Sequence, residues 1–515
     1  MSTLYRGGPI YAEGNPTALL VDRNTISWLG SEVDAPAAET VVDVNGGWLA
    51  PAFVDAHVHA TSSGLALTGL DLGDAPSLVE AMARLELHAR HGRGAPILGA
   101  GWDETRWPER RAPTRVELDR ASYGGLVYLP RIDMHSAVVS SALLAAVPGV
   151  ASLAGFRPDG LVTLDAHHAC RQAARQLLTP RQRQVAQSAT LARAAAHGIG
   201  CLHEMAGPDV SSEADLRGLL DLAAADPAPE VIGYWADLGD VETAARLGLR
   251  GGAGDLFVDG TIGSRTAALH EPYADTDGPG SLRYDAEAIA GHVIACVQAG
   301  QQPGFHVIGD RAVEAVLDGL ELAAARVGTA ELRAARPRLE HVEMAGAAAV
   351  QRLAALGGVA SVQPAFDALW GGERGMYAAR LGADRARPMN PLAAFAAFGV
   401  PLALGSDAPV TPIDPWGGVR AAVQHRTDGA GLLPTAAFTA ATAGGWTVAR
   451  VDGGGVLRVG AKATFAVWAL AGTLTPDGLP DLTDPDPECQ RTVVAGRTIY
   501  SATPDAPEEL ASCQP

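Results

Sequence analysis

The stretch Trp48–His59, WLAPAFVDAHVH, is an apolar run that reaches Asp55 and is followed by two histidines, His57 and His59. Successive side chains of a β-strand point to opposite faces, so residues two apart share a face. If this run is extended, both imidazoles leave the end of the strand side by side. Because neutral imidazole is a good ligand for zinc-like divalent cations, the pair predicts a metal site. An HxH pair also arises by chance, so this prediction needs support from other strands.

The composition sets the class of protein. The chain has 515 residues, 47% of them hydrophobic, which is enough for one very large domain or two. Its 60 glycines and 34 prolines, with 5% aromatic residues, predict many short connections, as in a repeated strand–helix fold. The formal net charge of −19 argues against a nucleic-acid or anionic-membrane partner, since both require concentrated Lys and Arg.

The cysteines and the N-terminal sequence indicate the cellular compartment in which we expect the protein. The five cysteines form no CxxC pair and their number is odd, which argues against a disulfide framework and fits a reducing cytosol. The N-terminal MSTLYRGGPIYAEG has no apolar segment of the signal-peptide kind, and no run of about eighteen apolar residues occurs elsewhere. We therefore expect a soluble, cytoplasmic protein.

Both ends of the chain have the texture of short strands and turns. Alternating Val-rich segments with Asp and Gly punctuation occur at residues 18–30 and 39–51, and again at 455–470 and 491–502. Chain ends often lie close together in space. We predict one small composite β-sandwich domain built from residues 1–52 and 451–515.

Between these ends, over residues 53–450, strand-like runs alternate with Ala/Leu/Arg-rich helical runs, which predicts a parallel α/β sheet, open or closed. Besides the opening stretch, the strand candidates are residues 96–102, 126–133, 198–204, 231–237, 255–259, 304–306, 338–341, 359–363 and 401–407. The helix candidates include residues 77–91, 181–197, 311–327 and 347–356. The ten strand candidates exceed the eight of a (β/α)₈ barrel, and we assign the surplus to an insertion around residues 65–175, where the alternation is least regular.

Metal-ligating residue types recur where these strands end. In parallel α/β barrels the catalytic groups gather at that face, because every strand delivers its last residues to one rim. We therefore expect these side chains to converge. They are His57, His59, Glu204, His306, His341 and Asp407.

Nine segments, spread over roughly residues 5–500, form a recognisable set. In chain order they read PAFVDAHVH, GWDETRW, LPRIDMHSAVVSSALL, GIGCLHEM, LFVDGTIGSRTAAL, FHVIGDRAV, LEHVEM, LGSDAP and GVLRVGAKATFAVW. In content and order they resemble the amidohydrolase superfamily of metal-dependent hydrolases, and within it the family 3 branch that includes the N-substituted formamide deformylases.

The resemblance implies a distorted (β/α)₈ TIM barrel with the composite β-sandwich, a divalent metal cofactor, most simply Zn²⁺ as one or two ions, and a homodimer. It implies that Asp407 is both a ligand and the general base. The alternatives are a helix N-cap for Asp407 and buried core positions for the later histidines. The implied ligands are His57, His59, His306, His341 and Asp407.

The sequence departs from the family at one position. Where the family carries a carboxylated lysine that bridges two metals, this chain has Asp255, which has a much shorter reach. We expect Glu204, on a neighbouring strand end, to supply the bridging carboxylate. Two alternatives remain: a single-metal site that uses neither residue, and a Glu204 that only orients a ligating histidine.

Three further residues are predicted to contact the substrate. Trp102 and His135 stand in motifs that line the pocket of the resembling family, and His135 could polarise a substrate oxygen. Arg265 follows a Gly-rich turn, where its guanidinium could meet an anionic group, although an ordinary salt bridge is equally compatible with the sequence.

Together these features predict an enzyme that cleaves a C–N bond, most simply the amide of a small organic compound, with a metal-activated water. The same metal centre would serve a cyclic amidase or a deaminase. A catalytically silent member that acts as a regulator or binding protein is the alternative outside enzymes.

Overall fold

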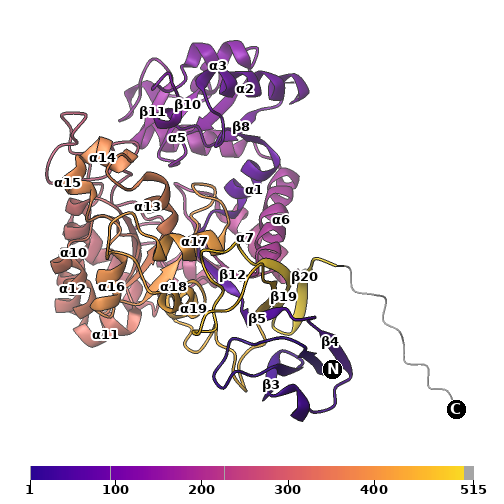
Figure 1. Cartoon of the computed structure of the whole chain (residues 1–515). Coiled ribbons are helices and arrows are strands. Elements are labelled where there is room, and N and C mark those ends of the chain that lie inside the picture. The colour runs from indigo at the N-terminus through magenta and orange to yellow at the C-terminus, as the bar shows by residue number, and fades with distance from the viewer. Residues whose placement is uncertain (1, 93, 226, 504–515) are drawn as a thin grey trace.

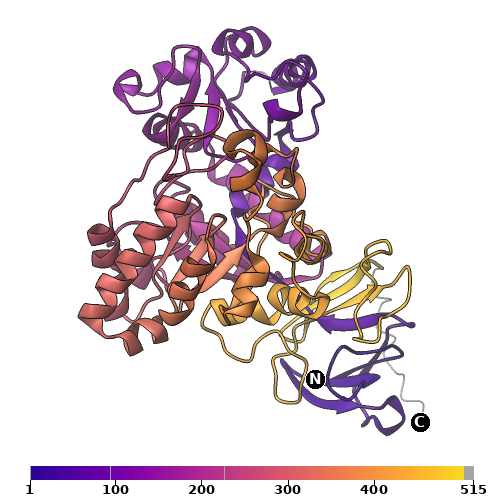
Figure 2. The same cartoon turned by 60° about the vertical axis from the view of Figure 1, so that its left-hand side comes forward.

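The computed structural model describes residues 2–92, 94–225 and 227–503. Figures 1 and 2 show the first strands, in indigo, and the last described strands, in yellow, together at one pole of the molecule, and a lobe drawn in purple at the opposite pole. A body of helices and parallel strands lies between them and carries the predicted ligands.

The central strands form two parallel sheets. One has the order β13–β12–β6, and the other β14–β15–β16–β17. The strands are β6 (Phe53–Val58), β12 (Ile199–Ala206), β13 (Glu230–Trp235), β14 (Gly304–Val307), β15 (Arg338–His341), β16 (Val359–Val362) and β17 (Leu402–Leu404). Except in part of β13 and at the first residue of β17, their side chains are buried, as expected for parallel strands with covered faces.

Isolated bridges connect the two sheets. Val58 at the end of β6 pairs with Ala408 just beyond β17. On the other side, Phe257 pairs with His306 of β14, and Trp235 of β13 donates a backbone hydrogen bond to Gly251. The segment 250–258 therefore lies between β13 and β14.

The predicted strand 255–259 is wrong as a regular strand, because only the Phe257 bridge is present there. The reason is the glycine-rich sequence before it. Gly254 has a φ of +87°, and a Cβ at this position would lie 2.8 Å from the sulfur of Met205. The segment packs against β12 with an irregular backbone, and this decides where Asp255 lies.

Helices follow most central strands and cover the sheets. α10 is an example: Val313, Val316, Leu317 and Leu320 form one buried stripe at helical spacing. The helices are α1 (Ala60–Thr68), α6 (Pro180–Ala196), α7 (Glu213–Ala225), α8 (Val241–Arg246), α9 (Ala286–Gln298), α10 (Asp310–Val327), α11 (Thr329–Ala335), α12 (Ala347–Ala355), α13 (Pro364–Trp370), α14 (Met376–Leu381), α15 (Ala383–Ala386), α16 (Leu392–Ala397), α17 (Pro415–Val423), α18 (Pro434–Ala441) and α19 (Ala443–Val448).

The lobe at the far pole has its own five-stranded sheet, in the order β11–β10–β9–β8–β7. Two of the ten strand candidates, 96–102 and 126–133, belong to it as β8 and β9. Its elements are β7 (Leu70–Asp71), α2 (Leu78–Gly92), β8 (Ile97–Ala100), η2 (Glu104–Arg106), α3 (Arg115–Ala121), β9 (Val127–Pro130), β10 (Ser136–Val139), α4 (Ser141–Ala145), η3 (Val150–Ser152), β11 (Leu161–Thr163) and α5 (Leu164–Gln176).

The chain ends form two four-stranded sheets, β3–β2–β1–β4 and β20–β19–β18–β5. The second contains strands from both ends, because β5 pairs antiparallel with β18. Tyr5 and Phe465 meet edge to face at 4.9 Å between the sheets. The elements are β1 (Ser2–Arg6), β2 (Ala18–Asp22), β3 (Thr25–Gly30), η1 (Glu32–Asp34), β4 (Thr40–Asp43), β5 (Trp48–Pro51), β18 (Phe465–Ala469), β19 (Glu488–Val494) and β20 (Arg497–Ser501). Residues 504–515, included in the predicted composite domain, lie outside the described residues.

Cys170, Cys201, Cys296 and Cys489 are free thiols. Among the described residues, the helices are either too short or too polar to cross a bilayer.

Candidate metal centre

His57, His59 and Asp407 meet where β6 and β17 end. Asp407 donates its backbone N–H to the carbonyl of His57 at 2.8 Å, and His59 donates to the carbonyl of Ala408 at 3.0 Å. Asp55 fixes the loop after β17, because its carboxylate accepts from the backbone and hydroxyl of Ser406. As a result, Oδ1 of Asp407 lies 3.4 Å from Nε2 of His57 and 3.1 Å from Nε2 of His59.

Asp255 lies at the centre of the cluster. Its Oδ1 is 3.4 Å from Nε2 of His57, 3.5 Å from Nδ1 of His306 and 3.6 Å from Nε2 of His341. Its Oδ2 is 3.1 Å from Nε2 of His59. One short carboxylate thus faces four imidazoles that come from three strands.

The outward nitrogens of the imidazoles are held by protein groups. Nδ1 of His57 contacts Glu340 at 2.9 Å, Nδ1 of His59 contacts the carbonyl of Met205 at 3.1 Å, and Nδ1 of His341 contacts Gln363 at 2.8 Å. These contacts fix the ring orientations and direct the other nitrogen of each ring into the cluster.

The donor set fits a divalent cation. Nε2 of His57, Oδ1 of Asp255, Nδ1 of His306 and Oδ1 of Asp407 are buried and lack a hydrogen-bond partner within the described part of the chain. Buried polar atoms are rarely left unpaired, so their convergence needs an explanation. Two groups of donors lie within 4.8 Å and share His57: one adds Asp255 and His341, the other His59 and Asp407. Imidazole and carboxylate are ligands that Zn²⁺ prefers.

The electrostatics of the cluster favour positive charge. Burial lowers the pKa of His57, but Asp255 and Asp407 outweigh this effect and hold the pKa well above its usual value. The same two carboxylates overcome burial at His59 and raise its pKa to about 9. Burial raises the pKa of Asp255, yet the imidazoles of His57, His306 and His341 hold it well below the usual range. Two buried carboxylates with neutral ligands provide the charge that a dication needs.

The structure does not bring Glu204 into this cluster. Its Oε2 accepts a hydrogen bond from the backbone of Ala60 at 2.8 Å, and burial raises its pKa to about 8. Asp255 occupies the central position that the sequence analysis gave to Glu204. The prediction underestimated Asp255 because it assumed a regular strand, whereas the irregular backbone after Gly254 carries the short side chain inward.

A buried polar network beneath the cluster was missed by the sequence analysis. Glu340 contacts His57, and Arg338 donates to Glu340 from Nε at 2.5 Å. Arg338 also contacts His203 at 2.9 Å and the hydroxyl of Tyr234 at 3.2 Å. The sequence contained a signal for this network. Arg338 and Glu340 are two residues apart in the strand candidate 338–341, so they would share one face of the strand.

His135 lies beside the cluster on the turn between β9 and β10 of the lobe. Its ring is 4.9 Å from the ring of His306 and 5.1 Å from that of Phe257. Burial, followed by the neighbouring His306, lowers its pKa well below the usual value, so the imidazole is neutral. His135 and four of the cluster's neighbours line one small pocket with Asp407, namely Glu343, Phe366, Trp370 and Tyr377.

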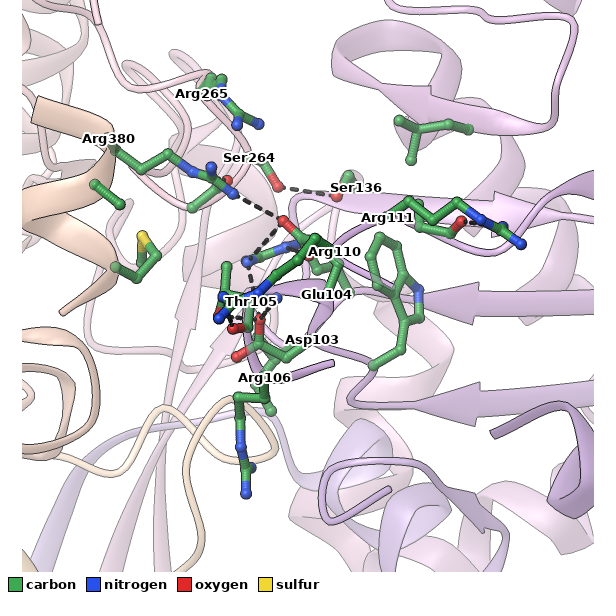
Figure 3. A pocket seen from close by; sticks show the side chains of 18 of the residues that line it. Asp103, Glu104, Thr105, Arg106, Arg110, Arg111, Ser136, Ser264, Arg265 and Arg380 are labelled. Carbon is green, nitrogen blue, oxygen red and sulfur yellow. Dashed lines mark hydrogen bonds and ion pairs between the residues drawn. The ribbon is translucent and has the colours of Figure 1, made fainter. Parts of the chain in front are cut away.

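The other two predicted substrate residues lie farther out. Trp102 is buried, donates its indole N–H to the carbonyl of Leu129 and contacts Trp107 within the lobe. Arg265 forms a salt bridge with Asp275 at 2.6 Å. Neither residue lines the pocket of His135 and Asp407; both line a larger adjoining cavity, part of which is shown in Figure 3.

Comparison with known proteins identifies relatives over most of the chain. The model of the amidohydrolase family matches residues 40–500. The N-substituted formamide deformylase of Arthrobacter pascens is 26% identical over 460 residues, covering 82% of this chain and 83% of that protein. YtcJ of Bacillus subtilis, an amidohydrolase by name, is 27% identical over 472 residues, covering 83% of this chain and 84% of that protein.

A solved structure shows a similar fold. A metal-dependent hydrolase from Pyrococcus horikoshii superposes with a TM-score of 0.73 at 23% identity, covering 93% of this chain and 100% of that one. The likeness extends to the whole α/β arrangement around the cluster.

Proposed function

Because the chain belongs to the amidohydrolase family and is a hydrolytic enzyme that acts on carbon–nitrogen bonds, we propose that it cleaves the amide bond of a small organic substrate at the metal centre described above. The observation that carries this proposal is the convergence of four buried, unpaired donor atoms from His57, Asp255, His306 and Asp407.

For the fold, we propose a distorted (β/α)₈ barrel with a composite β-sandwich domain. The support for the barrel is that the segment 250–258 fills the gap between β13 and β14, while Val58 and Ala408 pair at the opposite junction. The support for the sandwich is the pairing of β5 with β18 and the contact between Tyr5 and Phe465.

The cofactor we propose is zinc, as one or two ions. It would be held by the six residues of the cluster, which are His57, His59, Asp255, His306, His341 and Asp407. A bound dication would polarise the substrate carbonyl and lower the pKa of a water molecule. Asp255, rather than Glu204, would supply the central carboxylate ligand, because it faces all four imidazoles. A zinc complex is known for the atrazine chlorohydrolase TrzN of Arthrobacter aurescens, which shares the fold at a TM-score of 0.52 and 13% identity.

The protein's own residues provide the proton transfers. Asp407 accepts a proton from the attacking water and returns it to the leaving nitrogen. Its backbone is tied to β6 by the hydrogen bond to the carbonyl of His57, while Oδ1 of its carboxylate has no hydrogen-bond partner among the described residues and can take the proton. His135 is neutral and lines the same pocket as Asp407, so it can donate a hydrogen bond to the substrate oxygen. The buried walls of Phe366 and Trp370 limit the access of bulk water.

A substrate panel tests this function. The zinc-loaded enzyme is assayed with N-formyl amines, N-acyl amines and cyclic amides, with an identical series after chelation. We expect the open-chain amides to be hydrolysed and chelation to abolish the reaction. Turnover of cyclic amides alone would favour the cyclic amidase, and a folded, zinc-loaded protein that hydrolyses none of them would favour the regulatory alternative.

A further inference from the structure

A cavity of about 930 Å³ adjoins the pocket of the metal centre (Figure 3). Gly263, Trp370 and Met376 line both spaces, so the two are neighbours across a single layer of residues. The volume of the cavity is in the range of sites that hold small organic ligands. A substrate whose amide lies near His135 would place a second group in this cavity if that group passes Gly263, Trp370 and Met376.

One turn of the lobe serves both spaces. Arg131 and Ser136 line the larger cavity, whereas Asp133 and His135, which lie between them in sequence, line the metal pocket. Asp133 accepts hydrogen bonds from Thr261 at 2.8 Å and Ser264 at 2.7 Å, which ties this turn to the loop after Asp255. The distance between the two binding spaces is thus fixed by a hydrogen-bonded unit.

The residues that line the larger cavity are mainly cationic, although the chain as a whole is acidic. The protein as a whole has 58 acidic and 39 basic residues, yet this lining has eight arginines against three acids. Five of the arginines are paired with carboxylates: Arg111, Arg131, Arg157, Arg265 and Arg380. Their partners outside the lining add three acids (Glu117, Asp133 and Asp275), so cations still exceed acids. A concave, positively charged wall focuses its field on anions.

Three arginines of the wall have no carboxylate partner among the described residues. Arg110 donates to the carbonyl of Thr105 at 2.5 Å, whereas Arg106 donates to the carbonyl of Gly73 at 2.9 Å and its side chain turns away from the other labelled residues (Figure 3). Arg374 is exposed before α14. A backbone carbonyl uses one N–H of a guanidinium, which leaves the other donors of each fork for a ligand.

Arg265 adds a third donor, after Arg110 and Arg374, from the side of the metal centre. Its φ of 58° lies in the left-handed region, which a residue other than glycine adopts at a cost and which is frequent at functional sites. Asp275 binds Nε and Nη2 of the guanidinium, so Nη1 is the remaining donor. The side chain is half-buried in the wall, close to Ser264 and Arg380 (Figure 3).

From this juxtaposition we infer that the cavity binds a carboxylate carried by the substrate, which makes the substrate class N-formyl or N-acyl amino acids and related acidic amides. Guanidinium forks bind carboxylates with paired, charge-assisted hydrogen bonds. Arg110, Arg265 and Arg374 supply the donors, while the amide lies at the metal centre. The inference rests on the proposed amide hydrolysis.

The test compares three compounds that differ only at the acid: N-formylphenylalanine, its methyl ester and N-formylphenethylamine. With the zinc-loaded full chain, we expect kcat/KM for the acid to exceed that of each neutral compound by at least about tenfold at low salt. The advantage should shrink in about 0.5 M NaCl, because salt screens the arginines.

Single substitutions test whether the arginines of the cavity cause the preference for the acid. Arg374→Gln and Arg110→Gln should each lower the ratio of acid to neutral kcat/KM by about threefold to tenfold. Arg326→Gln removes the same charge from an exposed position of α10 and should leave both the ratio and the rates unchanged.

Each remaining outcome is decisive. Equal turnover of acid and neutral compounds overturns the inference, as does a preference that neither arginine variant reduces. If no compound is hydrolysed, the proposed function fails, and titration calorimetry then tests the cavity alone. In that assay, N-formylphenylalanine must bind at least about tenfold more tightly than its methyl ester, and Arg374→Gln must weaken its binding, or the inference fails as well.

Discussion

Asp407 has a backbone φ of 53°, in the left-handed region that costs a residue other than glycine about 1 to 3 kcal/mol. The cost is offset by the hydrogen bonds that tie its loop to β6, including those from Ser406 to Asp55. The strained backbone places the carboxylate against His57 and His59, where we propose that it acts as the general base.

We predict that Asp407→Asn retains the fold but lowers kcat by about two to four orders of magnitude, since an amide cannot accept the proton. Steady-state kinetics and thermal unfolding measure the two effects. Asp384→Asn, on the exposed surface of α15, is the control and should leave kcat unchanged. Near-normal kcat in Asp407→Asn would remove Asp407 from the proposed role.

The individual residues also show what could be read from the sequence. His57, His59, His306, His341 and Asp407 were predictable, because strand ends determine their position and the structure brings them together. That Asp255, and not Glu204, faces the imidazoles was not predictable. The position of Asp255 depends on the irregular backbone around Gly254, and a pattern of residue types does not specify such a backbone.

At the scale of the element, strand β15 contributes both to the metal centre, through its last residue, and to the buried ion pair beneath it. His341 faces the cluster from the end of the strand, while Arg338 and Glu340 form a fully buried ion pair beneath it. Removing one member of such a pair leaves the other charge buried and uncompensated. The strand therefore couples the stability of the interior to the orientation of His57.

We predict that Arg338→Met lowers the free energy of unfolding by about 3 to 5 kcal/mol, measured by chemical denaturation. Arg338→Met combined with Glu340→Leu should cost less than the sum of the two single changes, because no unpaired charge remains. Arg352→Met removes an exposed pairing with Glu321 on α10 and serves as the control, with a cost below about 1 kcal/mol. Additive effects of the two buried changes would contradict this account.

Helix α3 carries an ion pair nearer the surface, whose contribution to stability depends on pH. Glu117 completes a capping box with Thr114 and pairs with Arg111. The hydrogen bonds from Arg111, supported by those from Thr114, lower the pKa of Glu117 to about 2. Because this value lies below that of an unfolded chain, the contribution to stability is complete above about pH 4.5 and is lost as the pH falls towards 2.

We predict that the difference in Tm between the wild type and Glu117→Gln is largest near pH 6 to 7 and shrinks from pH 5 to pH 3. Gln can still complete the capping box, so this variant isolates the charge. The side chain is 30% exposed and that of its partner Arg111 is 49% exposed, so solvent screens the pair and limits the effect to less than about 1 kcal/mol. A Tm difference that stays constant over this pH range would rule out the ion pair as its source.

At the scale of the whole molecule, the chain order predicted the main arrangement. The alternation of strands and helices indicated a parallel α/β body, and the two surplus strand candidates belong to the lobe of β7 to β11. The similar texture of the two chain ends anticipated the pairing of β5 with β18. These features are local patterns or follow from repetition along the chain.

The cavity between lobe and body was not predictable in the same way. It depends on contacts between distant segments, such as Arg380 of α14 with Glu104 of η2 at 2.8 Å, and Ser264 with Asp133. The sequence identified Arg265 as a candidate for an anion, but the other seven arginines of the cavity lie between residues 106 and 380. Only the fold shows that they face one space.

The most direct test of the central claim is the zinc content of the folded protein after chelation and reconstitution, measured by elemental analysis. We predict one to two zinc ions per chain in the wild type, a loss of at least one ion in His57→Ala and Asp255→Asn, and the wild-type content in Glu204→Gln. A wild-type protein that is folded but binds no zinc would contradict the account, and so would a Glu204→Gln variant that loses its zinc while Asp255→Asn retains it.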